Sequence, residues 1–196
     1  MSEPYSLVVA CQIAPDDLRK WLNGGVPAPD RYPDWTELDI QLFPDDYEPA
    51  FRESDRKPRA YLRDLRDVAM ENYGWRFRHD GPSGQLNIVS LAFTQNWPEI
   101  IAGLTVLRSL APLCPQGGYV LVHGFAFRQG QTACALSFTG GRSLFVHGPA
   151  VGGLVDHAGP LADHVLKRAN AAFAADPPPP AAQVCTDQLD SFAGQP

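Results

Sequence analysis

Residues 119–146 read YVLVHGFAFRQGQTACALSFTGGRSLFV, and this stretch decides the fold. Three apolar runs, over residues 119–128, 132–138 and 143–146, are separated by short connections that contain glycine. Runs of this length that end at glycine-containing turns are typical of strands joined as hairpins. The stretch therefore predicts an antiparallel meander. Because residues 100–155 contain three arginines and no carboxylate, we expect the meander to lie in the core.

Further strands and helices are predicted on both sides of the meander. Apolar runs and alternation predict strands over residues 7–13, 38–42, 75–78 and 86–93. Apolar residues at helical spacing predict helices over residues 15–23, 58–72, 96–111 and 160–173. Asn96 with Glu99 predicts a capping box on the third helix, and Pro160 is predicted to begin the last one.

This order of elements predicts a single α+β domain. Hairpins rather than regular strand-helix-strand crossovers favour an antiparallel or mixed sheet with helices packed mainly on one face. A chain of 196 residues is also within the range of one domain. We expect the domain over residues 1–175 and a proline-rich C-terminal tail over residues 176–196.

Composition indicates a cytoplasmic protein that binds neither nucleic acid nor a membrane. The net charge of -6 disfavours nucleic acid, because phosphate groups are neutralised by clustered Lys and Arg. No signal-peptide pattern follows Met1, and no apolar run approaches the ~20 residues that span a bilayer. The four cysteines form no CxxC pair, which favours free thiols in a reducing compartment. No common nucleotide-binding, hydrolase or metal motif is present, so no cofactor is expected.

The segment from Asp30 to Asp55 is the most strongly charged part of the chain. It contains nine carboxylates against two arginines, with five aromatic residues between them. Carboxylates steer a cationic partner, and aromatic side chains supply contact area. The predicted partner-binding residues are Asp34, Trp35, Glu37, Asp39, Asp45, Asp46, Tyr47 and Glu48. In the alternative interpretation, Trp35, Phe43 and Phe51 anchor the segment in the core and the carboxylates only keep a loop soluble.

Two histidines offer a catalytic alternative. His123 and His147 each follow a valine near the end of a predicted strand. Paired histidines on neighbouring strands can act as acid and base on a phosphodiester, which favours a small hydrolase or phosphodiesterase. One enzyme family of this kind has Ser or Thr two residues after each histidine, whereas this chain has Phe125 and Pro149. Structural histidines are therefore expected, and no catalytic residue is predicted.

Metal and thiol sites are weaker alternatives. Asp156-His157 and Asp163-His164 would supply metal ligands, but the intervening Gly159-Pro160 predicts that the two pairs do not share one helix face. Cys114 and Cys134 have apolar neighbours, which raise the pKa of a thiol and disfavour a nucleophile. We expect no metal ligands and no catalytic cysteine.

The predicted third helix begins Asn96-Trp97-Pro98-Glu99-Ile100-Ile101-Ala102-Gly103-Leu104 and leads into the apolar meander. With its small size, acidic composition and α+β order, the chain resembles bacterial immunity proteins over residues 5–175. Such proteins guard against polymorphic or type VI secreted toxins. The resemblance implies a tightly bound cognate toxin, often with its active site covered. Because these families vary in fold, it assigns no functional residue.

We therefore predict a non-enzymatic binding protein that neutralises a toxin with a basic cleft, such as a nuclease. Asp34, Glu37 and the carboxylates that follow would pair with Arg and Lys of the toxin. A structural or assembly subunit is the remaining alternative, in which the apolar middle third and the tail form an oligomer interface.

Overall fold

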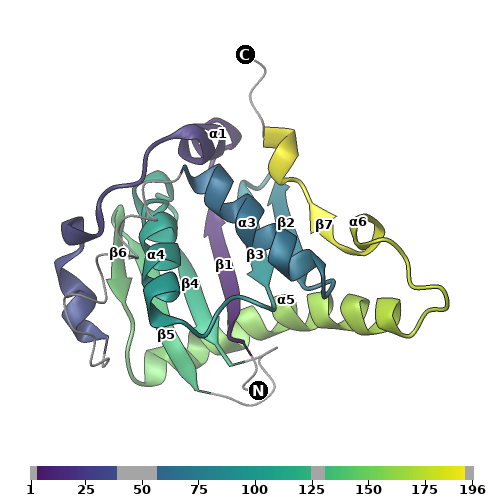
Figure 1. The fold of residues 1–196 in the computed structure, drawn as a ribbon. Coiled ribbons are helices and arrows are strands. Elements are labelled where there is room, and N and C mark those ends of the chain that lie inside the picture. The colour runs from purple at the N-terminus through teal and green to yellow at the C-terminus, as the bar shows by residue number, and fades with distance from the viewer. Residues whose placement is uncertain (1–3, 39–56, 125–130, 193–196) are drawn as a thin grey trace.

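The computed structural model describes residues 4–38, 57–124 and 131–192, and these residues form an α+β domain around one sheet (Figure 1). The strands are β1 (Ser6–Gln12), β2 (Trp75–Asp80), β3 (Gln85–Ser90), β4 (Gly118–His123), β5 (Thr132–Thr139), β6 (Arg142–Phe145) and β7 (Thr186–Asp187). The helices are α1 (Pro15–Asn23), α3 (Pro58–Met70), α4 (Trp97–Arg108), α5 (Pro149–Phe173) and α6 (Ala181–Val184). No helix in these ranges is both long and apolar enough to cross a membrane.

Among the described residues the sheet has seven strands in the order β6-β5-β4-β1-β3-β2-β7. All neighbours are antiparallel except β2 and β7, which are parallel, so the sheet is mixed. The predicted meander is confirmed as β4, β5 and β6, although residues 125–128 of its first run lie outside the described residues. Of the strand predicted over residues 38–42, only Leu38 is described, and it follows a short 3-10 helix.

β1 lies at the centre of the sheet because both of its faces are apolar. Leu7 and Val9 pack on one side with α1, α3 and α4, whereas Val8 packs on the other side with α5. A strand that is buried on both faces reads as a continuous apolar run, and this is the pattern of the N-terminal sequence. Helices thus lie mainly on one face of the sheet, as predicted, while α5 crosses the opposite face (Figure 1).

The predicted capping box on α4 is wrong. The Asn96 side chain makes no capping hydrogen bond. Instead, the Thr94 hydroxyl donates to Glu99 and accepts from the backbone N–H of Asn96. Glu99 therefore does accept a hydrogen bond at the start of the helix, but the donor is Thr94, two residues before the predicted Asn96. Thr94 lies where the approaching chain turns toward the helix.

The predicted start of the last helix is also wrong, because α5 begins at Pro149 and Pro160 lies inside it. An internal proline costs about 3 kcal/mol since it removes one helical hydrogen bond. Ala158 and Ala162 flank Pro160 and are fully buried against the sheet, while Pro160 itself is exposed. Burial on both sides of the proline keeps the helix continuous, and this burial comes from tertiary packing.

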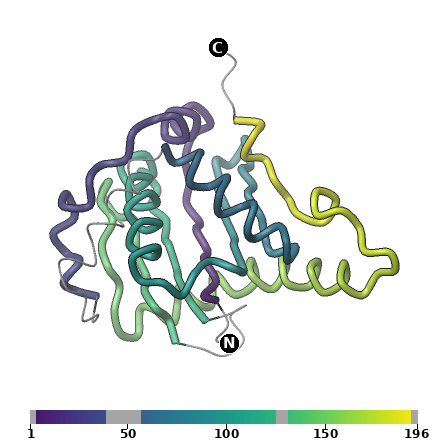
Figure 2. The backbone as a smooth tube through the Cα atoms, in the orientation of Figure 1, coloured from purple at the N-terminus to yellow at the C-terminus, as the bar shows by residue number. Residues whose placement is uncertain are grey.

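The C-terminal residues return to the sheet (Figure 2). The sequence predicts a tail from residue 176, whereas the structure packs residues 184–192, here called the C-terminal strap, along the β2 edge. Arg76 pairs in register with Thr186, and Leu189 is fully buried. The apolar residues of the strap are spaced irregularly, so they carry no periodic signal that would predict an element.

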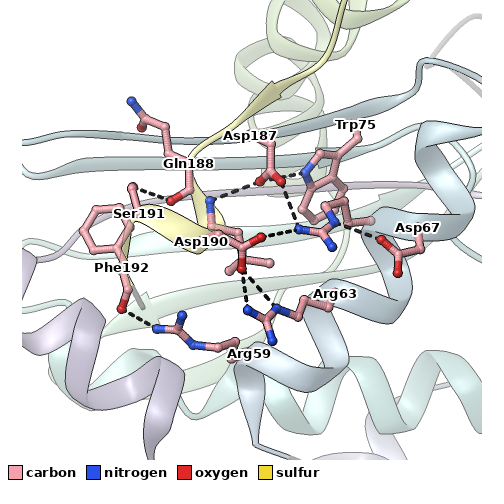
Figure 3. Close-up of polar contacts among 11 residues, drawn as sticks. Arg59, Arg63, Asp67, Trp75, Asp187, Gln188, Asp190, Ser191 and Phe192 are labelled. Carbon is pink, nitrogen blue, oxygen red and sulfur yellow. Dashed lines mark hydrogen bonds and ion pairs between the residues drawn. The ribbon is translucent and has the colours of Figure 1, made fainter. Parts of the chain in front are cut away.

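Arginines of α3 hold the strap in place (Figure 3). Arg63 contacts Asp190 at 2.6 Å, and Arg66 contacts the same carboxylate at 2.9 Å. The hydrogen bond from Arg63, with a second from Arg66, holds the pKa of Asp190 below its ordinary value. Arg59 donates to the carbonyl of Phe192. The charged face of α3 is therefore occupied by the strap.

Replacing Leu189 with alanine is expected to lower the free energy of unfolding by about 2–5 kcal/mol, the cost of a large cavity in a core. Urea denaturation followed by circular dichroism measures this. Ser191→Ala, at an exposed position of the same strap, should change the value by less than about 0.5 kcal/mol. Equal small effects of both substitutions would show that the strap is not part of the cooperative fold.

Candidate functional site

The first part of the acidic segment is clamped to the domain. Residues 29–38, here called the stem, form two short 3-10 helices, η1 (Pro29–Arg31) and η2 (Pro33–Glu37), which begin at prolines. Proline at a first helical position is favourable because its fixed φ angle suits a helix. The Trp35 indole donates to the carbonyl of Pro29 at 2.9 Å and ties the two turns together. Leu38 is buried at the end of the stem.

Arg108, the last residue of α4, is the centre of the clamp. Its side chain is 1% exposed, and its Nη2 lies 2.6 and 2.7 Å from the two carboxylate oxygens of Asp34. Arg108 also donates through Nε to the Ser143 hydroxyl on β6 at 2.8 Å. One guanidinium therefore joins a helix, a strand and the stem.

Three aromatic rings enclose this guanidinium. Its central carbon lies 4.2 Å from the ring centroid of Tyr32, 4.8 Å from that of Trp35 and 5.0 Å from that of Phe145. Arg108 Nη1 is buried without a hydrogen-bond partner among the described residues. The π faces of the rings attract this unpartnered part of the cation, so the cage offsets some of its desolvation.

The structure divides the predicted partner-binding residues into three groups. Asp34 and Trp35 point into the domain, where they form the clamp, although the prediction placed them on a binding surface. Glu37 is half exposed and lies 3.1 Å from the Nε2 of His147. The other five predicted residues, Asp39, Asp45, Asp46, Tyr47 and Glu48, lie outside the described residues. The alternative interpretation, a core anchor, therefore describes Trp35 correctly.

Two cavities flank the stem. One, of about 220 Å³, lies between the end of the stem and the ends of β5 and β6, and it is lined by Glu37, Thr132, Cys134 and His147 among others. The second, of about 330 Å³, lies on the other side of Arg108 and is bordered by Arg31, Arg142 and the exposed Leu144. Residues of the stem thus line both cavities.

The two strand histidines differ in environment. His123 is buried, its Nδ1 lies 2.9 Å from the hydroxyl of Thr132, and burial lowers the pKa of its ring. His147 is exposed and lines the 220 Å³ cavity, whereas His123 is not among the residues that line it. Thr132 lines that cavity too and contacts His123.

The structure also bears on the two weaker alternatives, a metal site on α5 and a reactive cysteine. Because α5 is continuous, His157 and His164 lie two turns apart on one face of the helix, and the prediction that they do not share a face is wrong. No group of three potential ligands gathers anywhere in the described ranges. Burial raises the pKa of the Cys134 thiol to about 12, which keeps it protonated and unreactive.

A cleft between α3 and α4 was not predicted from the sequence. It measures about 200 Å³ and has apolar walls that include Leu65, Phe93 and the exposed Val68, with Asp64 and Glu99 as its carboxylates. The sequence pattern placed Val68 on the apolar stripe of α3, whereas the structure exposes it at the cleft.

The clamp can be tested by removing the charge of one of its two partners. Asp34→Asn leaves the buried Arg108 charge uncompensated, so the free energy of unfolding should fall by about 3–5 kcal/mol. Asp30→Asn, at an exposed position of the same stem, should change it by less than about 0.5 kcal/mol. The double variant Asp34→Leu with Arg108→Met should cost less than the sum of its single substitutions. Equal urea midpoints for Asp34→Asn and Asp30→Asn would contradict the clamp.

The chain was compared with models of protein families, with curated proteins and with solved structures, and none of the three comparisons found a match. Its function is therefore argued from the stem, the cavities and the charges alone.

Proposed function

We propose that the chain is a non-enzymatic binding protein that acts in the cytoplasm and neutralises a cognate bacterial toxin. The acidic segment would cover the toxin, and a toxin with a basic cleft, such as a nuclease, fits its charge. The observation that supports this proposal best is the clamp, because it fixes the start of a segment with nine carboxylates to a rigid domain.

Fixing the stem has an energetic advantage for binding. A charged segment that is free at both ends loses conformational entropy when it is ordered by a partner, whereas a clamped stem has paid this cost during folding. Asp34 is neutralised by Arg108 and adds little to the attraction, so Asp30 and Glu37 are the exposed carboxylates of the stem. The remaining carboxylates of the segment would steer the basic partner and speed its association.

The α3–α4 cleft supplies a second argument for a basic partner. A Lys or Arg side chain has an apolar stem and a charged end, and it would place the stem against Leu65 and Val68. Its charge would then lie near Asp64 and Glu99. A cleft with apolar walls and two carboxylates therefore fits the same class of partner as the acidic segment.

The test uses the protein encoded by the neighbouring reading frame as the candidate toxin. Co-expression with the full chain should restore growth, and the two proteins should elute as one complex. Replacing Asp45, Asp46 and Glu48 with lysine should slow association and weaken binding by a few kcal/mol, about 2–5. Biolayer interferometry at several salt concentrations measures both quantities.

The control replaces three other carboxylates with lysine, Asp16, Asp17 and Glu71, which lie on α1 and after α3. The change in net charge is the same, but the position is different. Equal weakening by both triple variants, or none by the first, would refute the assigned surface. Light scattering on the isolated chain separates this proposal from an assembly subunit, which would form a stable oligomer without a toxin.

A hydrolase that uses the strand histidines is the second candidate. The contact between Thr132 and His123 favours it, because Thr132 lines the cavity that also contains His147 and Glu37. Water would attack the phosphorus of a phosphodiester while one histidine takes its proton. The other histidine would protonate the alcohol that leaves.

Hydrolysis of bis(p-nitrophenyl) phosphate decides between the two candidates. A binding protein should show no rate above background. An enzyme should show a rate that falls by about 100-fold or more in His147→Gln, the scale of general acid–base catalysis. His157→Gln, an exposed histidine on α5, is the matched control and should leave that rate unchanged. Activity lost only in His147→Gln would replace the toxin-binding proposal.

A further inference from the structure

α5 leaves part of its sheet face uncovered. The buried residues Ala158, Ala162 and Val165 pack on the middle of the sheet, against strand residues such as Val8 and Leu121. Beyond them lies an open groove of about 510 Å³ between the flank of α5 and the ends of β1, β3 and β4. The basic side chains of β2 and α5 that are described below lie beyond the residues that line this hollow. We call the hollow and these neighbouring side chains together the α5 groove. None of its lining residues belongs to the stem or its cavities.

Side-chain amides form the floor of the groove at one end. Gln12, Gln85, Asn87 and Gln116 line it, and Gln85 lies opposite Gln12 in the register of β1 and β3. Asn87 lies opposite Arg78 in the register of β3 and β2, so the floor continues from amides to a guanidinium. Amides both donate and accept hydrogen bonds, and a polar surface of this kind suits a polar ligand.

Cationic side chains gather at the other end. Strand alternation places Arg76 and Arg78 on the α5 side of β2, because the alternating residues Trp75 and Phe77 are buried in the opposite core. On α5, His157, His164 and Arg168 follow one face at spacings of seven and four residues. Arg168 donates to the hydroxyl of Thr186 at 2.9 Å, and Thr186 is the register partner of Arg76.

Few negative charges compensate this cluster. In the described part of the chain, no ion pair involves Arg76, Arg78, Lys167 or Arg168. The Nε of Arg76 is buried and has no hydrogen-bond partner among the described residues. Burial, followed by the charges of Arg78 and Arg168, lowers the pKa of Arg76.

Two carboxylates lie near the cluster, and one of them, Asp80, interacts with Arg78: hydrogen bonds from Ser83, followed by the charge of Arg78, lower the pKa of Asp80. Asp80 follows Arg78 on the same face of β2, and its carboxylate accepts hydrogen bonds from the backbone and hydroxyl of Ser83. Asp163 precedes His164 on α5 and is exposed. Arginines that are held together with few counter-charges cost free energy in the unliganded protein, and a bound anion removes this cost.

We infer that the α5 groove binds a soluble small molecule that carries a phosphate group. Arg76, Arg78 and Arg168 hold the phosphate, and Lys167 adds charge at the rim. The amides of Gln12, Gln85 and Asn87 bind the polar remainder of the molecule. This inference is independent of the proposed toxin binding, because the groove lies on the opposite face of the sheet from α3 and α4.

Inorganic pyrophosphate is the probe, measured by isothermal titration calorimetry with the full chain at constant ionic strength. Saturable binding of one molecule per chain in the millimolar range or tighter is expected. Arg78→Gln with Lys167→Gln, both at exposed positions, should weaken it by about tenfold or more. The matched control, Arg19→Gln with Lys20→Gln on α1, also removes one arginine and one lysine and should change it by less than about twofold.

Nuclear magnetic resonance locates the same probe. The backbone amide signals of residues 85–87 and 164–168 should shift on titration, while those of residues 29–37 should not. Three outcomes would overturn the inference: no saturable binding, equal weakening by both double variants, or shifts outside the α5 groove. Binding to vesicles of phosphatidylglycerol with no binding of pyrophosphate would also overturn it, because the ligand would then be a lipid surface.

Discussion

The buried contact between Arg108 and Asp34 is the constraint on which the candidate site depends. A guanidinium that is 1% exposed cannot remain charged at low cost without a counter-ion, and the nearest one comes from a segment 74 residues earlier. The same group binds β6 through Ser143 and is enclosed by rings from the stem and from β6. The buried charge of Arg108 on α4 therefore holds the stem in place, and the position of the stem follows from the fold of the domain.

The two faces of the sheet carry different local groups of charged residues. The face covered by α1, α3 and α4 is bordered by the stem, from which the acidic segment continues, and by a cleft with two carboxylates. The α5 face has a groove with a basic end. The net charge of -6 is a sum over the whole chain and does not describe either surface. Much of it comes from residues 39–56, which contain six carboxylates and two arginines. Local fields, which set the choice of partner, depend on where the charges lie.

Ion pairs have a different use at the C-terminus. Arg59 and Arg63, which are close in sequence to the acidic segment, bind the C-terminal strap. This leaves the carboxylates of the stem to Arg108 and His147. The strap also covers one edge of the sheet, where unpaired backbone groups would otherwise invite another strand.

The sequence by itself determined the secondary structure wherever a periodic apolar pattern ended at a proline or glycine, as in β1, α1, α3 and the meander. Local rules suffice there, because burial follows the spacing of residues along one element. Tertiary structure alone decided the continuity of α5 through Pro160, the docking of Leu189 and the inward direction of Asp34 and Trp35. Each depends on partners far away in the sequence. A charged or aromatic residue gives the same sequence pattern whether its side chain faces solvent or contacts a buried arginine. Its role is therefore decided only when the elements pack.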